Sequence, residues 1–125
     1  MNRAGFAVGV ILGAGLAGAK LGSLVQQAPA TAARVENPFR GDQRAERAGA
    51  KLYARECASC HGLNREGRNN APPLDLPEIY RSAPGTLFWV LRNGSLRRGM
   101  PSFAHLPEPQ RWQIVTFLQN RATRH

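Results

Sequence analysis

The sequence has few of the residues that staple a small protein or build a hydrolytic site. Only two of its 125 residues are cysteines, and both lie within one pentapeptide, so no disulfide framework holds the chain. Its eight acidic residues are scattered singly, and no serine or cysteine stands beside an unengaged base, so no hydrolytic site is indicated. At this length there is room for one domain plus a leader or tail, which excludes a two-domain enzyme with a separate cofactor module.

Lysine is also scarce, although positive charge is not. Fifteen of the 17 cationic residues are arginines, and with eight acidic residues they give a formal net charge of +9. Hydrophobic residues make up 42% of the chain and aromatic residues 7%, which is typical of a globular domain rather than a disordered chain. The chain is therefore expected to fold and to present a surface rich in arginine.

A long apolar run lies at the beginning of the chain. A basic start at Arg3 is followed by uncharged, mostly apolar residues from Ala4, and the run passes Lys20 and ends at Val25. As a helix this run would be about 33 Å long, enough to cross a bilayer. Residues 1–25 are therefore expected to be a signal peptide or an uncleaved membrane anchor helix. Either one places the folded domain on the periplasmic side of the inner membrane, anchored or soluble, because Arg3 keeps its own flank in the cytoplasm.

The residues after this run decide between the two possibilities. A signal peptide would be cleaved at a small-x-small site, and three such sites are present: Ala17-Gly18-Ala19, Ala28-Pro29-Ala30 and Ala30-Thr31-Ala32. An uncleaved anchor would leave the Ala/Pro/Gln-rich residues 26–43 as a tether. The folded domain is then expected over residues 44–125.

A helical pattern starts at Arg44 and leads into the most specific motif of the sequence. Apolar residues recur there at three- and four-residue intervals, and Asp42 is a suitable N-cap. The pattern ends in Cys57-Ala58-Ser59-Cys60-His61, and C-x-x-C-H is the attachment signature of c-type haem. Two thiols three residues apart on a helical turn face the same side, so both can add to the two vinyl groups at one porphyrin edge. The adjacent His61 is then carried under the ring, where its imidazole can bind iron.

Two other uses of this motif fit the sequence less well. A thioredoxin-like C-x-x-C stands at the start of a helix after a buried strand, whereas this motif ends a helix. A zinc site on Cys57, Cys60 and His61 would need a fourth ligand at normal spacing, and only the distant His105 and His125 remain. The pattern therefore favours one covalently attached haem c.

The second axial ligand of such a haem is expected to be Met100. The chain has two methionines, and Met1 belongs to the leader. Met100 stands between a glycine and a proline in an irregular turn, and His105 is its rival as a ligand. A thioether is a soft, neutral ligand that favours ferrous iron and raises the reduction potential. With His61 and Met100 both bound, the iron would have no open position, which disfavours a haem enzyme or gas sensor.

Taken together, these segments resemble a bacterial class I (monohaem) cytochrome c over residues 49 to about 120. The matching segments are a first helix and haem box at 49–62, a middle helix at 86–94, a ligand loop at 99–103 and a closing helix at 112–118. The resemblance implies a small all-α cytochrome c fold, in which three main helices wrap around one covalently bound haem. By position, the first and last helices would cross where Gly49 and Tyr53 meet Ile114 and Phe117.

The resemblance also implies a partner for the ligand histidine. In that family a proline carbonyl accepts a hydrogen bond from the histidine's other ring nitrogen, which fixes the ring and raises its basicity. Pro72 and Pro73, which follow His61 at 11 and 12 residues, are the candidates. The loop 62–70 departs from the family's Gly-x-Gly run, because after Gly62 it contains only Gly67.

The function implied is electron transfer, not enzymatic catalysis. The chain would carry single electrons in a periplasmic respiratory or dehydrogenase-linked chain, or serve as the cytochrome subunit of a larger oxidoreductase complex. Its partners would be redox proteins with an acidic docking surface, because arginines flank the haem box and the ligand loop (Arg65, Arg68, Arg97 and Arg98). The exported location argues against nucleic acid as a partner, and the closed iron argues against a small-molecule substrate.

Overall fold

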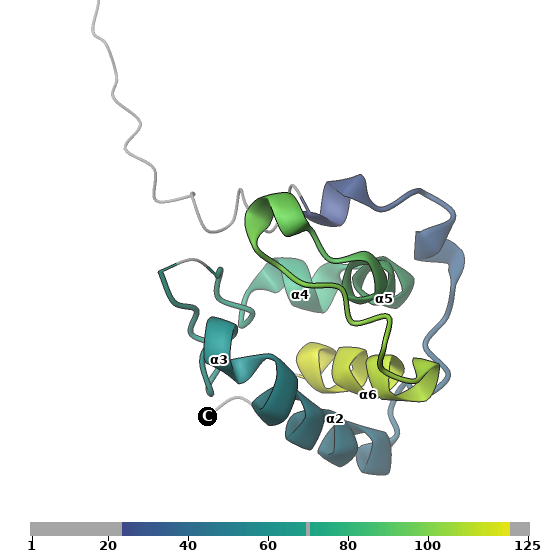
Figure 1. Cartoon of the computed structure of the whole chain (residues 1–125). Helices are drawn as coiled ribbons and strands as arrows, with labels where there is room; N and C mark the ends of the chain where they lie inside the picture. Colours follow the sequence, from purple (N-terminus) through teal and green to yellow (C-terminus); the bar gives the residue numbers. More distant parts are fainter. Residues whose placement is uncertain (1–23, 70, 121–125) are drawn as a thin grey trace, which may run out of the picture.

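The computed structural model describes residues 24–69 and 71–120, and these form helices joined by loops (Figure 1). In chain order the elements are η1 (Ala32–Arg34), α2 (Gln43–Glu56), α3 (Ala58–His61), α4 (Pro77–Arg81), α5 (Pro84–Asn93), η2 (Leu96–Arg98) and α6 (Glu108–Gln119). Within the described ranges, β pairing is limited to two isolated bridges. The predicted all-α fold with three main helices is confirmed, the three being α2, α5 and α6.

Helix α2 begins and ends as its sequence predicts. The Asp42 side chain accepts hydrogen bonds from the backbone N–H groups of Arg44 and Ala45, at 2.8 and 3.1 Å, which caps the helix. One face of the helix is buried along its length (Ala45, Gly49, Leu52 and Tyr53). The chain leaves α2 at Cys57, so this helix delivers the C-x-x-C-H motif directly into the single turn of α3.

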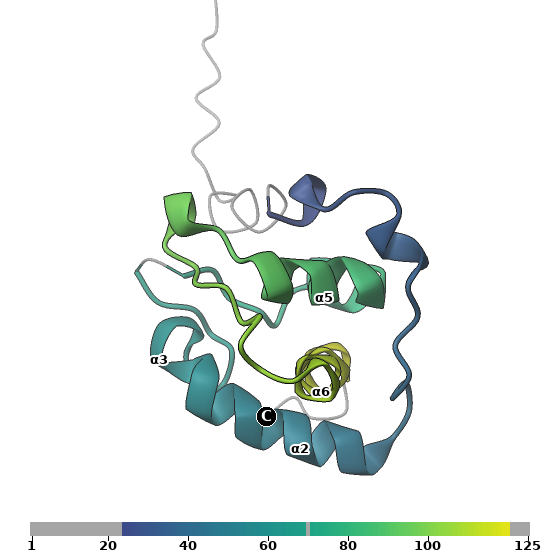
Figure 2. The same cartoon turned by 45° about the vertical axis from the view of Figure 1, so that its right-hand side comes forward.

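Helices α2 and α6 cross at close range, with α6 seen almost end-on above α2 in Figure 2. A side chain at Gly49 would overlap the Gln113 carbonyl oxygen and would lie 2.9 Å from Cβ of Phe117. One helical turn later the rings of Tyr53 and Phe117 pack with centroids 5.4 Å apart. Ile114 is fully buried in the same core. The crossing implied by the family resemblance is present, and glycine permits it because it has no side chain.

The segment between the expected leader and α2 lies against the domain. Gly85 of α5 approaches η1 so closely that a Cβ there would overlap the Ala32 carbonyl oxygen. Further along, Asn37 donates a hydrogen bond of 2.8 Å to the Thr116 hydroxyl of α6, and Phe39 packs against the core. Figures 1 and 2 show this segment passing α5 and α6 on its way to α2. Residues 26–43 have the composition of a tether and most of them are exposed, but Ala32, Asn37 and Phe39 attach the segment to the domain.

The predicted leader over residues 1–25 falls outside the described residues except for its last two positions, Leu24 and Val25. In the part of the chain that the structure describes, no helix has both the length and the apolar character needed to span a membrane.

Candidate haem-binding site

A cavity of about 760 Å³ lies between α3, α5 and the loop that carries Met100. Cys57, Cys60, His61 and Met100, which the sequence predicts as haem ligands, all line it. Most of the remaining wall is apolar (Leu24, Val25, Leu74, Ile79, Leu87, Val90, Leu91, Phe103 and Leu118). Such a volume and lining are those of a cofactor site, so the residues present fit a haem.

The two cysteines are held by a single helical turn. The backbone N–H groups of Cys60 and His61 both donate to the Cys57 carbonyl oxygen, at 3.2 and 2.9 Å. Cys57 is buried and Cys60 exposed, and both are free thiols. Burial, with smaller contributions from the neighbouring Glu56 and Cys60, raises the pKa of the Cys57 thiol to about 12. A reactive cysteine instead has a lowered pKa. Within residues 24–69 and 71–120, no three acidic, cysteine or histidine side chains are arranged so that they could hold a metal ion.

His61 is oriented by the carbonyl of Pro72. Its Nδ1 lies 2.8 Å from the Pro72 carbonyl oxygen, and because a carbonyl only accepts, Nδ1 carries the proton. The lone pair is therefore left on Nε2, at the other side of the ring. Burial lowers the pKa of His61, and the Pro72 contact opposes that effect. Of the two prolines that the sequence offers, Pro72 makes the contact, whereas Pro73 packs against Gly67.

The loop that presents Met100 is closed by backbone hydrogen bonds. Ser95 and Met100 exchange two of them, at 2.8 and 3.0 Å. Gly94, with φ of +59°, packs so tightly that a Cβ there would lie 2.5 Å from the Pro101 carbonyl carbon. Gly99 adopts the left-handed conformation in open space, so it is needed for its φ rather than for close approach. Met100 is half-buried against the core, whereas its rival His105 is exposed and lies outside the cavity lining.

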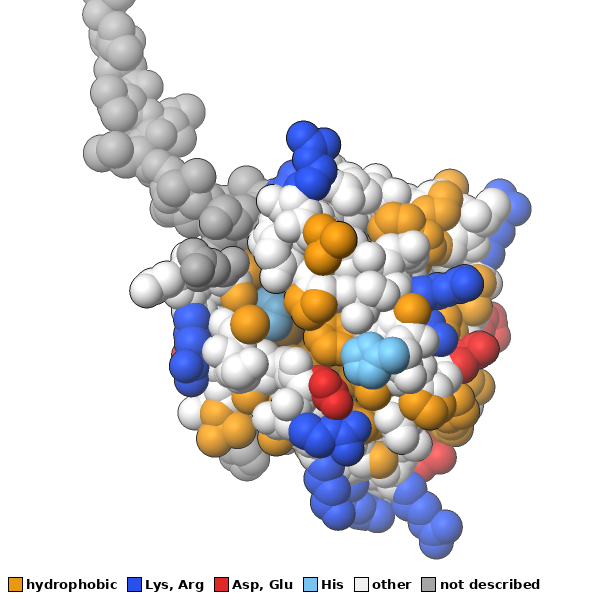
Figure 3. Space-filling model, in the orientation of Figure 1, with side chains coloured by type: hydrophobic (Ala, Val, Ile, Leu, Met, Phe, Trp, Pro, Cys, Tyr) orange, Lys and Arg blue, Asp and Glu red, His pale blue; other side chains and the backbone are white. Residues whose placement is uncertain are grey.

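Arg65, one of the arginines that the sequence predicts to be available for docking a partner, is instead buried. It is only 4% exposed, and its guanidinium carbon lies 4.9 Å from the centroid of the Phe117 ring. Its backbone has φ of +61°, a conformation that glycine usually supplies in such a loop. Arg68, Arg97 and Arg98 do line the large cavity. On the face shown in Figure 3, apolar side chains gather toward the middle and cationic ones stand mostly at the edge.

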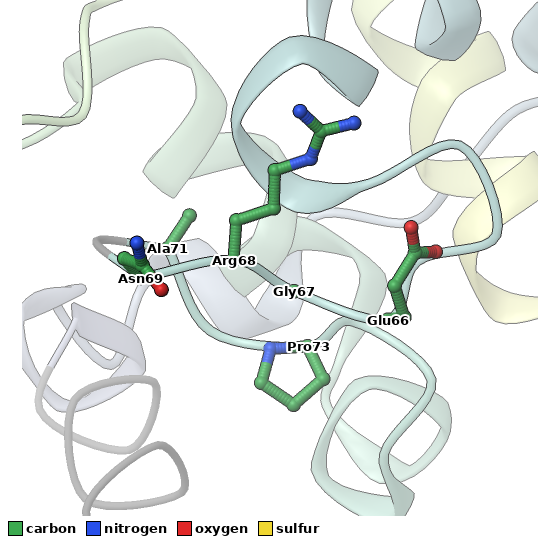
Figure 4. A pocket seen from close by; sticks show the side chains of 6 residues that line it. All are labelled: Glu66, Gly67, Arg68, Asn69, Ala71 and Pro73. Atoms are coloured by element: carbon green, nitrogen blue, oxygen red, sulfur yellow. The ribbon is translucent and has the colours of Figure 1, made fainter.

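A second, shallower hollow of about 320 Å³ lies on the loop between α3 and α4 (Figure 4). It is lined by a few, largely polar residues of this one loop (Glu66, Gly67, Arg68, Asn69, Ala71 and Pro73). In Figure 4 the side chains of Glu66, Arg68 and Pro73 point in different directions rather than toward one point. This hollow therefore has no convergent set of binding groups, and the large cavity remains the candidate site.

Sequence reasoning missed Leu24 and Val25, which also line the large cavity. Both were assigned to the leader because they end its apolar run. The only signal of a second role is that they lie beyond Lys20, which interrupts that run.

Comparison with known proteins agrees with this geometry. The family model described as cytochrome c oxidase, cbb3-type, subunit III matches residues 44–118. Quinohemoprotein alcohol dehydrogenase ADH-IIG from Pseudomonas putida is 38% identical over 78 residues, which are 60% of this chain and 10% of that protein. The chain therefore spans about a tenth of the length of this curated relative.

A solved structure is similar as well. The crystal structure of cytochrome CL from the marine methylotrophic bacterium Methylophaga aminisulfidivorans MPT matches with a TM-score of 0.57 and 26% identity. The match covers 71% of this chain and 59% of the cytochrome CL chain. The cavity, the motif and the family match lead to one conclusion: the chain belongs to the family of cytochrome c domains described as cbb3-type cytochrome c oxidase subunit III, and it is a haem-binding electron-transfer protein.

Proposed function

We propose that this chain is a one-electron carrier with a single haem c, attached through Cys57 and Cys60 and ligated by His61 and Met100. The observation that carries the proposal is that these four side chains line one largely apolar cavity, although three come from α3 and its N-cap and the fourth from a loop nearly 40 residues later. When bound, haem supplies an iron centre that takes up and releases one electron at a time.

Each ligand is prepared by its surroundings. Burial favours the neutral form of His61, and the Pro72 carbonyl holds the proton on Nδ1, which leaves the lone pair that binds iron on Nε2. Met100 adds a neutral thioether from a loop held by its bridge to Ser95. An apolar wall and a thioether both favour the ferrous form, which has the lower charge, so we expect a raised reduction potential. Two protein ligands also leave no coordination position for a substrate or a gas.

We further propose that the chain works on the periplasmic side of the inner membrane, exported by residues 1–25. The apolar run that follows Arg3 supports this location. The formal charge of +9 suits an acidic redox protein as partner. Three cavity-lining arginines (Arg68, Arg97 and Arg98) and an exposed leucine beside them, Leu96, offer a surface for brief docking. The likeness to part of a quinohemoprotein alcohol dehydrogenase favours a dehydrogenase-linked chain, and it equally supports a role as the cytochrome part of a larger oxidoreductase.

Ligation by Met100 is tested by comparing two single variants of the haem-loaded protein. In Met100→Ala we expect the sulfur-to-iron absorption band of the oxidised protein to disappear and the reduced protein to bind carbon monoxide readily. In His105→Ala we expect both properties to match the parent, because His105 is exposed and does not line the cavity. A band that survives in Met100→Ala, or ready carbon monoxide binding by the parent protein, would overturn the proposed ligand set. Mass analysis of the parent protein must also show one added macrocycle.

A further inference from the structure

The wall of the haem cavity includes residues that the sequence assigns to the leader. Leu24 is only 7% exposed, and Val25 packs against the main hydrophobic core. Both line the same cavity as Met100 and His61. Two apolar side chains from outside the region that resembles cytochrome c thus face the space that a haem would fill.

These two residues are held there by the packed segment that follows, residues 24–42, which we call the N-terminal strap. Its first turn is fixed by a hydrogen bond of 3.2 Å from the Ala28 N–H to the Val25 carbonyl oxygen. Next, the carbonyl oxygens of Ala32 and Val35 lie against Gly85 of α5, with the ideal Cβ position of that glycine only 2.6 Å from the Val35 oxygen.

The far end of the strap is fixed to a different helix. Asn37 donates a hydrogen bond of 2.8 Å to Thr116 of α6, and the same Asn37 side chain accepts one from the Phe39 N–H at 2.9 Å. Asp42 then caps α2. The strap is thus attached to α5, α6 and α2 in turn, so Leu24 and Val25 belong to a fixed wall and not to the end of a free tether.

We propose that Leu24 and Val25 raise the reduction potential of the haem by excluding water from its cavity, an inference that rests on the proposed function. Oxidation adds a positive charge at the iron, and water stabilises that charge better than an apolar wall does. Removing the wall therefore favours the oxidised form and lowers the potential.

The proposal also constrains processing of the N-terminus. Cleavage after Ala30 or Ala32 would remove both wall residues, whereas cleavage after Ala19, or no cleavage, retains them. We therefore expect the mature protein to begin before Leu24. Intact-mass analysis of haem-loaded protein from a periplasm-exporting host tests this directly, and a mature N-terminus after Ala30 or Ala32 would overturn the proposal.

The role of the wall is tested by a matched pair of variants in the full haem-loaded chain. Leu24→Asn places an amide in the cavity wall, and Val35→Asn places the same amide on the same strap at a side chain that is 49% exposed and does not line the cavity. We expect Leu24→Asn to reduce the equilibrium constant for reduction about three- to tenfold, which is about 30–60 mV for a one-electron couple. Val35→Asn should keep the parent potential. Equal potentials in the parent and Leu24→Asn would overturn the proposal.

Milder variants cover the case in which Leu24→Asn fails to load haem. Leu24→Ala and Val25→Ala keep the wall apolar but thin it, so each should shift the potential in the same direction by a smaller amount. An unchanged potential in both would equally overturn the proposal. Failure of the proposed function looks different, because the parent protein itself would then lack the sulfur-to-iron band. A parent with that band and a potential indifferent to Leu24 and Val25 would refute the wall alone.

Discussion

At the scale of single residues, Tyr53 ties the end of α2 to the turn that follows the haem motif. It is 1% exposed, and its hydroxyl donates a hydrogen bond of 2.6 Å to the Gly62 carbonyl oxygen. Burial, with a smaller contribution from Cys57, raises the pKa of this hydroxyl, so it remains a protonated donor. Tyr53→Phe would leave the Gly62 carbonyl without this donor. We expect a loss of about 1–3 kcal/mol in the free energy of unfolding of the haem-loaded protein, measured by denaturant titration.

Tyr80→Phe is the matched control for this loss. The Tyr80 hydroxyl donates to Asp75 in an exposed setting, where water can replace the lost partner. Its effect should stay within about 0.5 kcal/mol. Equal losses in the two variants would show that burial of the Tyr53 bond adds nothing to stability.

The sequence identified those site residues whose role can be inferred from their immediate neighbours in the chain. Cys57, Cys60 and His61 are contiguous, and their spacing alone specifies the chemistry that they suit. Met100 could be chosen because it is the only methionine beyond the leader. Arg65 could not be placed, because its burial depends on the Phe117 ring from a helix far along the chain. A charged residue in a polar loop looks exposed in the sequence, whatever the fold later places over it.

At the scale of elements, Gly49 sets how closely α2 and α6 cross. On helix propensity alone, Gly49→Ala would stabilise the protein by about 1 kcal/mol. The new Cβ would overlap the Gln113 carbonyl oxygen and lie 2.9 Å from Cβ of Phe117, so the two helices would have to separate. Because one contact is backbone, no side-chain rotation relieves it. We expect a net destabilisation of about 1–3 kcal/mol, measured by denaturant unfolding of the haem-loaded protein.

Lys51→Ala provides the comparison on the same helix. Lys51 is exposed and alanine is a good helix former, so this variant should change the free energy of unfolding by less than about 0.5 kcal/mol. A rise in stability for Gly49→Ala would contradict the crossing described here.

Some elements of the fold could be predicted from the sequence and others could not. Helix α2 was predictable from its apolar periodicity and its Asp42 cap, both of which are local. The N-terminal strap was not, because its Ala/Pro/Gln-rich composition is also that of a tether. What holds it in place is distant, as Asn37 is bonded to Thr116, 79 residues later. The amino-acid composition of the strap indicates only that it is soluble and flexible. Whether it packs against α6 depends on a surface of that helix that forms only when the chain folds.

At the scale of the whole molecule, the fold is arranged around its cavity. The helices α2 and α6 pack directly on each other, but α3, α5 and the Met100 loop meet across the cavity of about 760 Å³. A domain of this size has a marginal side-chain core, so the haem would complete the core as well as carry the electron. The same four residues would thus serve stability as well as function, since a haem held by them would connect α3 to the Met100 loop across the cavity.

The positive charge of the molecule affects how it meets its partners. Two variants can separate the effect of where that charge lies from the effect of the total net charge. Arg97→Gln and Arg44→Gln each remove one positive charge from an exposed residue, but Arg97 lines the cavity and Arg44 stands at the far end of α2. That helix has 14 residues, so the two ends lie about 20 Å apart, twice the Debye length of about 10 Å at 0.1 M salt.

We expect Arg97→Gln to slow oxidation of the reduced protein by a small anionic oxidant on the order of twofold at low salt. Arg44→Gln should have a much smaller effect, and the difference should vanish as the ionic strength is raised. Stopped-flow rates over a salt series measure both, and equal slowing in the two variants would mean that overall charge, rather than the arginines at the cavity, attracts the anionic reagent.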